Sequence, residues 1–376
     1  MQYLLTNCQV YTSAEVLNDH AVLVQDQHII ALIPQAQLPV GVSQIDGRGL
    51  YLCPGLIDLQ LYGGGGSAFG LAPSPAALAH LRSYTLRHGT TSFLPTVPTN
   101  APAIVDRAVS AIQQALPVMP GLLGLHLEGP YINPEKRGVH PTEFIEVPTP
   151  SGVHDLLQRS KGVLRFLTVA PEVLGPDALA VLRASSVILS VGHSNASYEQ
   201  GMEAFAQGFT AATHLFNAMS PLGSRAPGLV GAIYDDAAVC ASIVADGRHC
   251  AYASVRISKR VLGERLFLIS DATAASAQGA YYFQPQEDYF VAADGKLAGS
   301  GLTLLQAVRN CVQHVRLPLA ESLRMASLYP ARVLGLHHQL GRVAPGYQAD
   351  LCLFDAAFNV HATVLRGQLD WHIAPE

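Results

Sequence analysis

Five apolar stretches of this chain end abruptly in acidic or imidazole side chains, and this pattern restricts its possible folds more than any other feature. The stretches are Leu122–Glu128, Val187–His193, Thr210–His214, Ile243–His249 and Leu266–Thr273. Continuous apolar runs of this length are typical of buried parallel strands. In a parallel barrel every strand delivers its last residues to the same mouth, where barrel enzymes keep their chemistry. The pattern therefore predicts one shared polar site at a barrel mouth.

The middle of the chain, from Pro54 to about Leu336, alternates between strand-like and helix-like patterns. The strand-like runs are Gly55–Gln60, Thr90–Pro95, Leu122–Glu128, Leu164–Val169, Val187–His193, Phe209–His214, Val239–Ala245 and Leu266–Asp271. Helical spacing fills the gaps, for example from Pro75 and from Tyr198, where Ser197 is the expected cap. Eight such units predict an α/β fold, a (β/α)8 TIM-like barrel of about 250 residues or more.

Both ends of the chain contain short strand-like runs separated by polar turns instead. These runs are Leu4–Tyr11, Ala21–Gln25, His28–Ile33, Ala349–Asp355 and Ala362–Gly367. We expect the two ends to pair into one small β domain, residues 1–53 and 337–376, beside a catalytic barrel of residues 54–336. Two unrelated β extensions are the alternative. Residues 281–297 predict a β-hairpin inserted after the last barrel strand.

The composition excludes several classes of function. With 14% charged residues and a net charge of −5, the chain has no clustered basic face for nucleic acid or an anionic membrane. It has no apolar run of about 18 residues, as a membrane helix needs, and its N-terminus lacks the pattern of a signal peptide. Six scattered cysteines without C-x-x-C spacing predict reduced, mostly buried thiols in a cytoplasmic protein.

Three of the strand-end residues, Glu128, His193 and His214, form a candidate metal site. Imidazoles from successive strand ends can meet above a barrel at ligand distance, about 2.0 Å from a zinc ion. One glutamate and two histidines that leave a position open for water are a known catalytic zinc set. Each residue alone could be a hydrogen-bonded strand end, but three together favour a metal. Zinc, iron, cobalt and manganese all accept these ligands.

Other residues are candidates for acid–base chemistry and for anion binding. Asp271 ends the last barrel strand, where a carboxylate could take a proton from water beside a metal and return it to a leaving amine. A helix-capping role is the alternative. His249 could donate to a substrate hydroxyl or phosphate, and Arg225, in the Gly/Pro-rich segment 221–228, suits anion recognition. An exposed loop arginine is the alternative for Arg225, and His140 is a weaker candidate.

Taken together, these segments resemble the amidohydrolase superfamily and, within it, the N-acetylglucosamine-6-phosphate deacetylases, over nearly the whole chain. The motifs that carry the resemblance are Pro54–Gln60, Leu127–Pro130, Gly192–His193, Thr213–Met219, Asp246–His249, Ser270–Thr273, Leu297–Ser300 and Tyr329–Gly335. The resemblance implies a (β/α)8 barrel with a β-sandwich built from both chain ends. It implies a homodimer that deacetylates a phosphorylated amino sugar, with one divalent metal, usually zinc, on Glu128, His193 and His214 and with Asp271 as general acid and base.

The resemblance also implies a set of substrate contacts. These are Val139, His140, Asn217, Ala218, Arg225, His249, Leu297, Ala298 and Gly299. Arg225 could be contributed to the site by the same chain or by the partner subunit of the dimer. One departure concerns the end of the first barrel strand, where many superfamily members carry His-x-His for a second metal. This chain has Gln60 and Tyr62 there, which are poor replacements for two imidazoles, so we expect a single metal.

Three alternatives to this activity stay open. The substrate could be N-acetylgalactosamine 6-phosphate, which differs at one hydroxyl that a hydrogen-bonding site can discriminate. The chain could be another amidohydrolase that acts on a small cyclic or acylated amide, although Arg225 and Asn217 favour a phosphate anchor. It could also be a catalytically inactive barrel that serves as a binding protein, although Glu128, His193, His214 and Asp271 are all retained.

Overall fold

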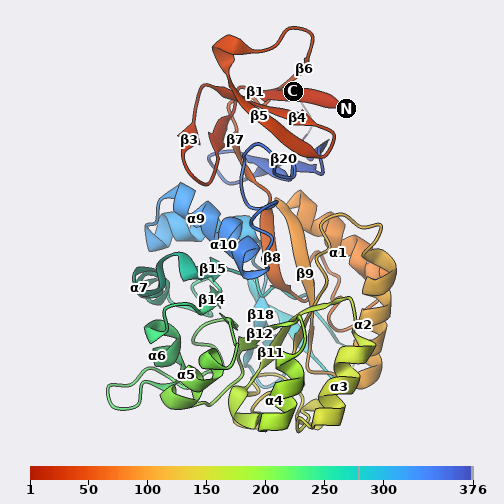
Figure 1. Cartoon of the computed structure of the whole chain (residues 1–376), viewed down its shortest axis with the longest axis vertical. Coiled ribbons are helices and arrows are strands. Elements are labelled where there is room, and N and C mark those ends of the chain that lie inside the picture. Colours follow the sequence, from red (N-terminus) through yellow and green to blue (C-terminus); the bar gives the residue numbers. More distant parts are fainter. Residues whose placement is uncertain (278–279, 374–376) are drawn as a thin grey trace. The chain divides into compact units, whose positions relative to one another are not determined.

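The computed structural model describes residues 1–277 and 280–373 (Figure 1). This part of the chain forms two compact units. One comprises Met1–Asp58, Ser83–Ser92 and Thr303–Glu376, and the other comprises Leu59–Arg82 and Phe93–Leu302. The domain boundaries that we predict after residues 53 and 336 remain a prediction. In the described part of the chain no helix is long and apolar enough to cross a membrane.

The predicted barrel is present as one parallel sheet of eight strands among the described residues. The strands are β8 (Leu56–Leu61), β9 (Thr90–Pro98), β10 (Leu125–Glu128), β11 (Leu164–Val169), β12 (Ile188–Val191), β13 (Ala211–Ala212), β14 (Cys240–Ile243) and β15 (Leu266–Leu268). Each strand neighbours the next one in sequence. A parallel bridge between Leu61 and Ala272 joins the first strand to the segment after the last, so the sheet closes. The (β/α)8 fold is confirmed.

The helices between the barrel strands begin where the sequence provides a start signal. They are α1 (Pro75–Arg87), α2 (Pro102–Ala115), α3 (Pro150–Arg159), α4 (Pro176–Arg183), α5 (Tyr198–Ala206), α6 (Gly228–Asp235) and α7 (Tyr252–Leu262). Four of them begin with proline, which suits the first helical turn because its missing N–H has no helical partner there. Ser197 caps α5 in a reciprocal capping box with Gln200, as predicted. Figure 1 shows α2 to α7 around the outside of the strands.

The segment after the last barrel strand contains the predicted hairpin with a further strand. Strands β16 (Phe283–Pro285), β17 (Tyr289–Ala292) and β18 (Leu297–Ser300) form a small antiparallel sheet. Tyr281, Phe283 and Ala298 form its buried apolar cluster, and Leu71 and Val139 pack against it. The insertion therefore presents a largely apolar surface to its surroundings in the barrel unit.

Both chain ends contribute strands to a β-sandwich, as predicted. One sheet has the order β5 (His28–Pro34), β4 (His20–Gln25), β1 (Gln2–Thr6), β6 (Ser43–Asp46). The other has the order β21 (Gln368–Trp371), β20 (Val360–Leu365), β19 (Leu351–Phe354), β7 (Tyr51–Pro54), β2 (Gln9–Tyr11), β3 (Val16–Leu17). Strand β7 pairs antiparallel with β19, which joins the two ends of the chain in one sheet.

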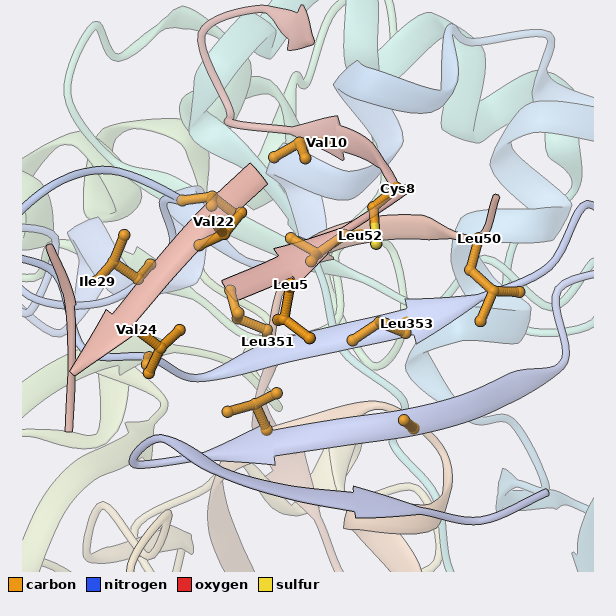
Figure 2. Packing of buried hydrophobic residues seen from close by; sticks show 14 of the residues in the cluster. Leu5, Cys8, Val10, Val22, Val24, Ile29, Leu50, Leu52, Leu351 and Leu353 are labelled. Atoms are coloured by element: carbon orange, nitrogen blue, oxygen red, sulfur yellow. The ribbon is translucent and has the colours of Figure 1, made fainter. Parts of the chain in front are cut away.

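One hydrophobic core holds the two sheets of the sandwich together (Figure 2). Leu5, Val22 and Ile29 come from the first sheet and pack against Leu52 and Leu351 of the second. The same unit contains α8 (Leu304–Asn310), a π-helical turn at Cys311–Val315, α9 (Leu319–Ala326) and α10 (Leu328–Val333). All six cysteines are free thiols, and all except Cys240 are buried, which agrees with the prediction of mostly buried thiols.

Candidate functional site

The residues that follow the barrel strands, together with the segment after the last strand, line a pocket with a cavity volume of about 180 Å³. It contains nearly all the residues that the sequence predicted for the site: Glu128, Val139, His140, His193, His214, Asn217, Ala218, His249, Asp271, Leu297, Ala298 and Gly299. Arg225 is the exception. It is exposed in the loop before α6 and is not among the described residues that line the pocket.

Three of the predicted catalytic residues reach the pocket through an unusual backbone conformation. His193, His214 and Asp271 have positive φ angles of 48°, 36° and 54°. Such values are uncommon outside glycine and cost about 1–3 kcal/mol each, so the surrounding structure must impose them. The strands end before these residues because the chain turns there, which explains why β12, β13 and β15 are shorter than predicted.

Glu128, His193 and His214 converge as the sequence predicted. Glu128 Oε1 lies 2.9 Å from His214 Nε2 and 3.2 Å from His193 Nε2, and the two Nε2 atoms are 3.2 Å apart. Ligands about 2.0–2.1 Å from a tetrahedral cation lie about 3.3 Å from one another, so this triangle fits one metal ion. His193 Nδ1 contacts the Lys136 carbonyl oxygen at 2.8 Å, which orients the ring and leaves Nε2 toward the triangle.

His140 is also close enough to take part in metal binding. Glu128, His140 and His193 can each offer a ligand atom within 4.8 Å of the other two. His140 Nε2, however, contacts Glu128 Oε2 at 3.0 Å, which is the oxygen outside the triangle. His214 is therefore the better third ligand, because its Nε2 lies beside both other ligand atoms.

Glu128 is surrounded by hydrogen-bond donors and is buried. The Tyr62 hydroxyl donates to Oε2 at 2.6 Å, and Gln60 Nε2 donates to Oε1 at 3.0 Å and to the Tyr62 oxygen at 2.6 Å. Burial alone would raise the pKa of Glu128, but the charges and hydrogen bonds of His193 and His140 outweigh it and hold the pKa well below its usual value. The site therefore presents an ionised carboxylate to a cation.

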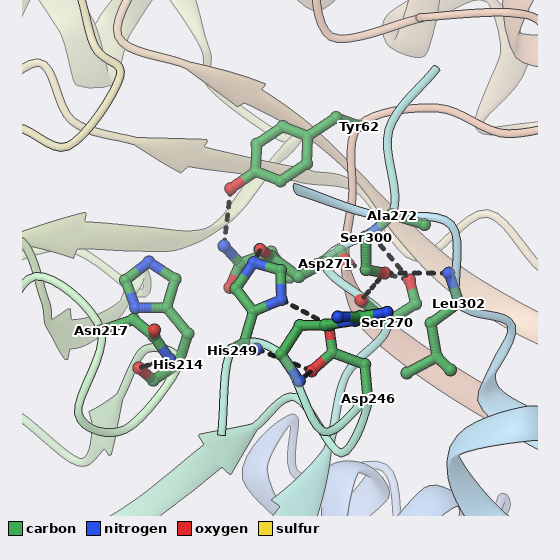
Figure 3. A network of polar contacts seen from close by, with 12 residues as sticks. Tyr62, His214, Asn217, Asp246, His249, Ser270, Asp271, Ala272, Ser300 and Leu302 are labelled. Atoms are coloured by element: carbon green, nitrogen blue, oxygen red, sulfur yellow. Dashed lines mark hydrogen bonds and ion pairs between the residues drawn. The ribbon is translucent and has the colours of Figure 1, made fainter. Parts of the chain in front are cut away.

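Asp271 lies at the end of a short line of charged and imidazole groups (Figure 3). Its Oδ2 is 3.6 Å from His249 Nε2, and His249 Nδ1 is 2.6 Å from Asp246 Oδ2. The other Asp246 oxygen accepts the backbone N–H groups of Arg248 and His249. Burial, together with the charge of Glu128, raises the pKa of Asp271 despite the opposing histidines. A raised pKa suits a group that must both accept and donate a proton.

Several residues that line the pocket or hydrogen-bond to its lining were not predicted as site residues. Tyr281 and Phe283 belong to the predicted hairpin, but nothing in their spacing showed that they would line the pocket with Leu71. In the sequence, Gln60 and Tyr62 were notable only as replacements for His-x-His. That replacement did not predict their hydrogen bonds to Glu128. Asp246 was part of a motif without a role of its own, and its contact with His249 appears only in the folded chain.

Comparisons with known proteins agree on one family. The Amidohydrolase family matches residues 51–369, and the family described as "NagA composite domain" matches residues 2–52. An N-acetylglucosamine-6-phosphate deacetylase of Haemophilus influenzae is 39% identical over 98% of this chain and 99% of its own length. An N-acetylgalactosamine-6-phosphate deacetylase of Escherichia coli O157:H7 is 33% identical over 98% of this chain and 99% of its own.

A solved structure gives the same result for the fold. The N-acetylglucosamine-6-phosphate deacetylase of Pasteurella multocida superposes with a TM-score of 0.94 and 35% identity, over 99% of this chain and 100% of its own. The similarity therefore includes both the barrel and the β-sandwich.

Proposed function

This chain belongs to the amidohydrolase family, and from that premise we propose that it hydrolyses the acetamide of N-acetyl-D-glucosamine 6-phosphate to D-glucosamine 6-phosphate and acetate. The observation that carries the proposal is the triangle of Glu128, His193 and His214 in one pocket with Asp271. Two deacetylases, one of them a solved structure, resemble the chain over almost its entire length.

We propose that the triangle holds one divalent metal, zinc, while iron, cobalt and manganese suit the same ligands. The family implies a divalent metal, and the donor set of one carboxylate and two imidazoles fits it. Such an ion would supply Lewis-acid chemistry at this site, activating water and polarising the amide carbonyl. Glu128, His193 and His214 would hold that ion. Each is at most 5% exposed, and each has a side-chain or backbone hydrogen bond to a neighbouring residue.

We assign the proton transfers to Asp271. Its carboxylate takes a proton from the attacking water as the new C–O bond forms at the acetyl carbon. The same proton then passes to the amide nitrogen as the C–N bond breaks, which releases acetate and the free amine. Asp271 Oδ1 is buried without a hydrogen-bond partner among the described residues, so it is available for this transfer. His140 lines the same pocket and would contact the substrate there, since its Nδ1 has no hydrogen-bond partner among the described residues.

We propose that the remaining pocket residues hold the sugar phosphate away from the reacting amide. Val139, Asn217, Ala218, Leu297, Ala298 and Gly299 line the pocket and would contact the substrate. His249 would donate to a hydroxyl or phosphate oxygen, with Asp246 fixing its orientation. Contacts remote from the amide position the carbonyl against the attacking water.

A homodimer would supply the missing phosphate anchor. The described pocket lining contains no lysine or arginine, although the substrate carries a phosphate. Arg225 lies in an exposed loop with Leu222. We propose that this loop contacts a second copy of the chain and that Arg225 reaches the partner's pocket, where a guanidinium can bind phosphate with two hydrogen bonds.

The free thiols of all six cysteines fit a reducing compartment, and we place the protein in the cytoplasm. The alternative substrate is N-acetylgalactosamine 6-phosphate, because an N-acetylgalactosamine-6-phosphate deacetylase also matches 98% of this chain. We favour the glucosamine epimer because the glucosamine-specific relative is 39% identical to this chain and the galactosamine-specific one 33%.

The experiment that tests the proposal measures acetate release by the zinc-loaded protein. Both N-acetylhexosamine 6-phosphates and both unphosphorylated sugars are supplied in parallel. We expect release that needs the 6-phosphate and is faster with the glucosamine epimer; faster release with the other epimer would transfer the assignment to it. No release from any of the four sugars, with zinc bound, would refute the deacetylase and favour another amide substrate or an inactive barrel.

A further inference from the structure

Tyr62 occupies a position in the pocket that no proposed catalytic step uses. It follows β8 and is buried, and its hydroxyl lies 2.6 Å from Glu128 Oε2. Gln60 lies two residues earlier and donates to both the Tyr62 oxygen and Glu128 Oε1. Because residues two apart in a strand point to the same face, β8 directs both side chains toward one carboxylate.

The hydrogen bonds of Glu128 can be counted for each oxygen. A carboxylate oxygen has two lone pairs. Those of Oε2 face the Tyr62 hydroxyl at 2.6 Å and His140 Nε2 at 3.0 Å. One lone pair of Oε1 faces Gln60 Nε2, and the other faces the triangle with His193 and His214. Glu128 therefore offers a single oxygen to a cation, and the oxygen that could bridge to a second cation already accepts two donors.

We infer that Tyr62 is a positioning residue that makes Glu128 a metal ligand through Oε1 alone. The inference rests on the proposed metal site. The phenol O–H donates to Oε2 from a buried ring and so keeps that oxygen from turning toward the cation. Gln60 Nε2 donates to the phenol oxygen, so the Tyr62 hydroxyl is hydrogen-bonded both as an acceptor, from Gln60, and as a donor, to Glu128.

The inference predicts metal affinity and metal stoichiometry, which are measured without any turnover. Metal-free protein is titrated with zinc against a chromophoric chelator, and bound zinc per chain is counted by elemental analysis. Wild type should bind one zinc. Tyr62→Phe removes only the hydroxyl and should weaken zinc binding about 10- to 100-fold, as losses of groups that orient metal ligands do.

Tyr3→Phe is the matched control, because the Tyr3 hydroxyl is also buried and hydrogen-bonded, to the Gly367 carbonyl oxygen in the β-sandwich. Its zinc affinity should equal that of wild type, whereas a loss as large as that of Tyr62→Phe would overturn the inference. Wild-type affinity in Tyr62→Phe would also overturn it. If wild type itself bound no zinc, the proposed metal site would fail first, which is a different result.

Discussion

Replacing Asp246 by asparagine should lower kcat/KM about 10- to 150-fold and leave the fold intact. The two oxygens of Asp246 have separate roles. Oδ1 accepts the backbone N–H groups of Arg248 and His249 at 2.9 and 2.8 Å, and Oδ2 contacts His249 Nδ1 at 2.6 Å. Asparagine keeps an oxygen for the two N–H groups, so the turn is retained. It places an NH₂ group against His249 Nδ1, which therefore loses its acceptor.

The size of the effect follows from the kind of hydrogen bond that is lost. A hydrogen bond to a charged group contributes about 1.5–3 kcal/mol. If the whole loss falls on the transition state, kcat/KM decreases by a factor of about 10–150, because each 1.4 kcal/mol is tenfold. Asp246 Oδ2 accepts from Nδ1–H and so favours the tautomer with the proton on Nδ1, whereas the asparagine NH₂ group would favour the tautomer with the proton on Nε2, the nitrogen that faces Asp271.

The assay is acetate release as a function of substrate concentration, with thermal unfolding measured on the same samples. Asp236→Asn is the matched control, because Asp236 Oδ1 also accepts two backbone N–H groups, from Ala238 and Val239. We expect wild-type kinetics from this control. If Asp246→Asn retained wild-type kcat/KM, or lost no more than Asp236→Asn, the assignment of Asp246 to the orientation of His249 would be wrong.

Three further predictions test the other parts of the site and the fold. Asp271→Asn should lower kcat about 100- to 10,000-fold, the usual contribution of general acid–base catalysis, with bound zinc unchanged by elemental analysis; near wild-type turnover would remove Asp271 from the mechanism. Arg225→Ala should raise KM for the phosphorylated substrate by about 10-fold or more, while sedimentation shows an unchanged oligomer; an unchanged KM would exclude Arg225 as the phosphate anchor. Burial raises the pKa of Asp350 from 3.8 to about 6 despite the N–H of Arg366, so its protonated form stabilises the fold. This contribution is complete below pH 3.8 and is lost as the pH rises through 6. Relative to Asp350→Asn, wild type should lose about 2.4 kcal/mol of unfolding free energy between pH 4 and pH 7, measured by urea unfolding; parallel pH profiles would contradict the buried carboxyl.

The amino-acid sequence was sufficient to predict the barrel and most of its site. Strand-end residues such as Glu128, His193 and His214 could be identified because each follows a continuous apolar run, and a parallel barrel directs every such end to one mouth. The Ser197 cap of α5 could also be predicted, since a capping box depends on residues only three apart. Pairing of the two chain ends followed from their shared strand-like pattern, and β7 and β19 confirm it.

The strand ends themselves could not be placed to the residue. We predicted Phe209–His214 as a strand, but β13 includes only Ala211–Ala212. The chain leaves the sheet earlier because His214 takes a positive φ of 36°. Its N–H is satisfied instead by Ser242 Oγ at 2.8 Å. Nothing in the local sequence specifies a hydrogen bond to a neighbouring strand 28 residues away.

What the sequence by itself determined is which residues stand at the barrel mouth. Only the tertiary structure decided which atoms of these residues contact one another and which residues line the pocket. It assigned one oxygen of Glu128 to the triangle and the other to Tyr62 and His140, and it left Arg225 outside the described pocket lining. The physical reason is that periodicity along a chain fixes the face on which a side chain lies. Contacts such as that of Tyr62 with Glu128, 66 residues apart, depend instead on strand register and on packing across the barrel.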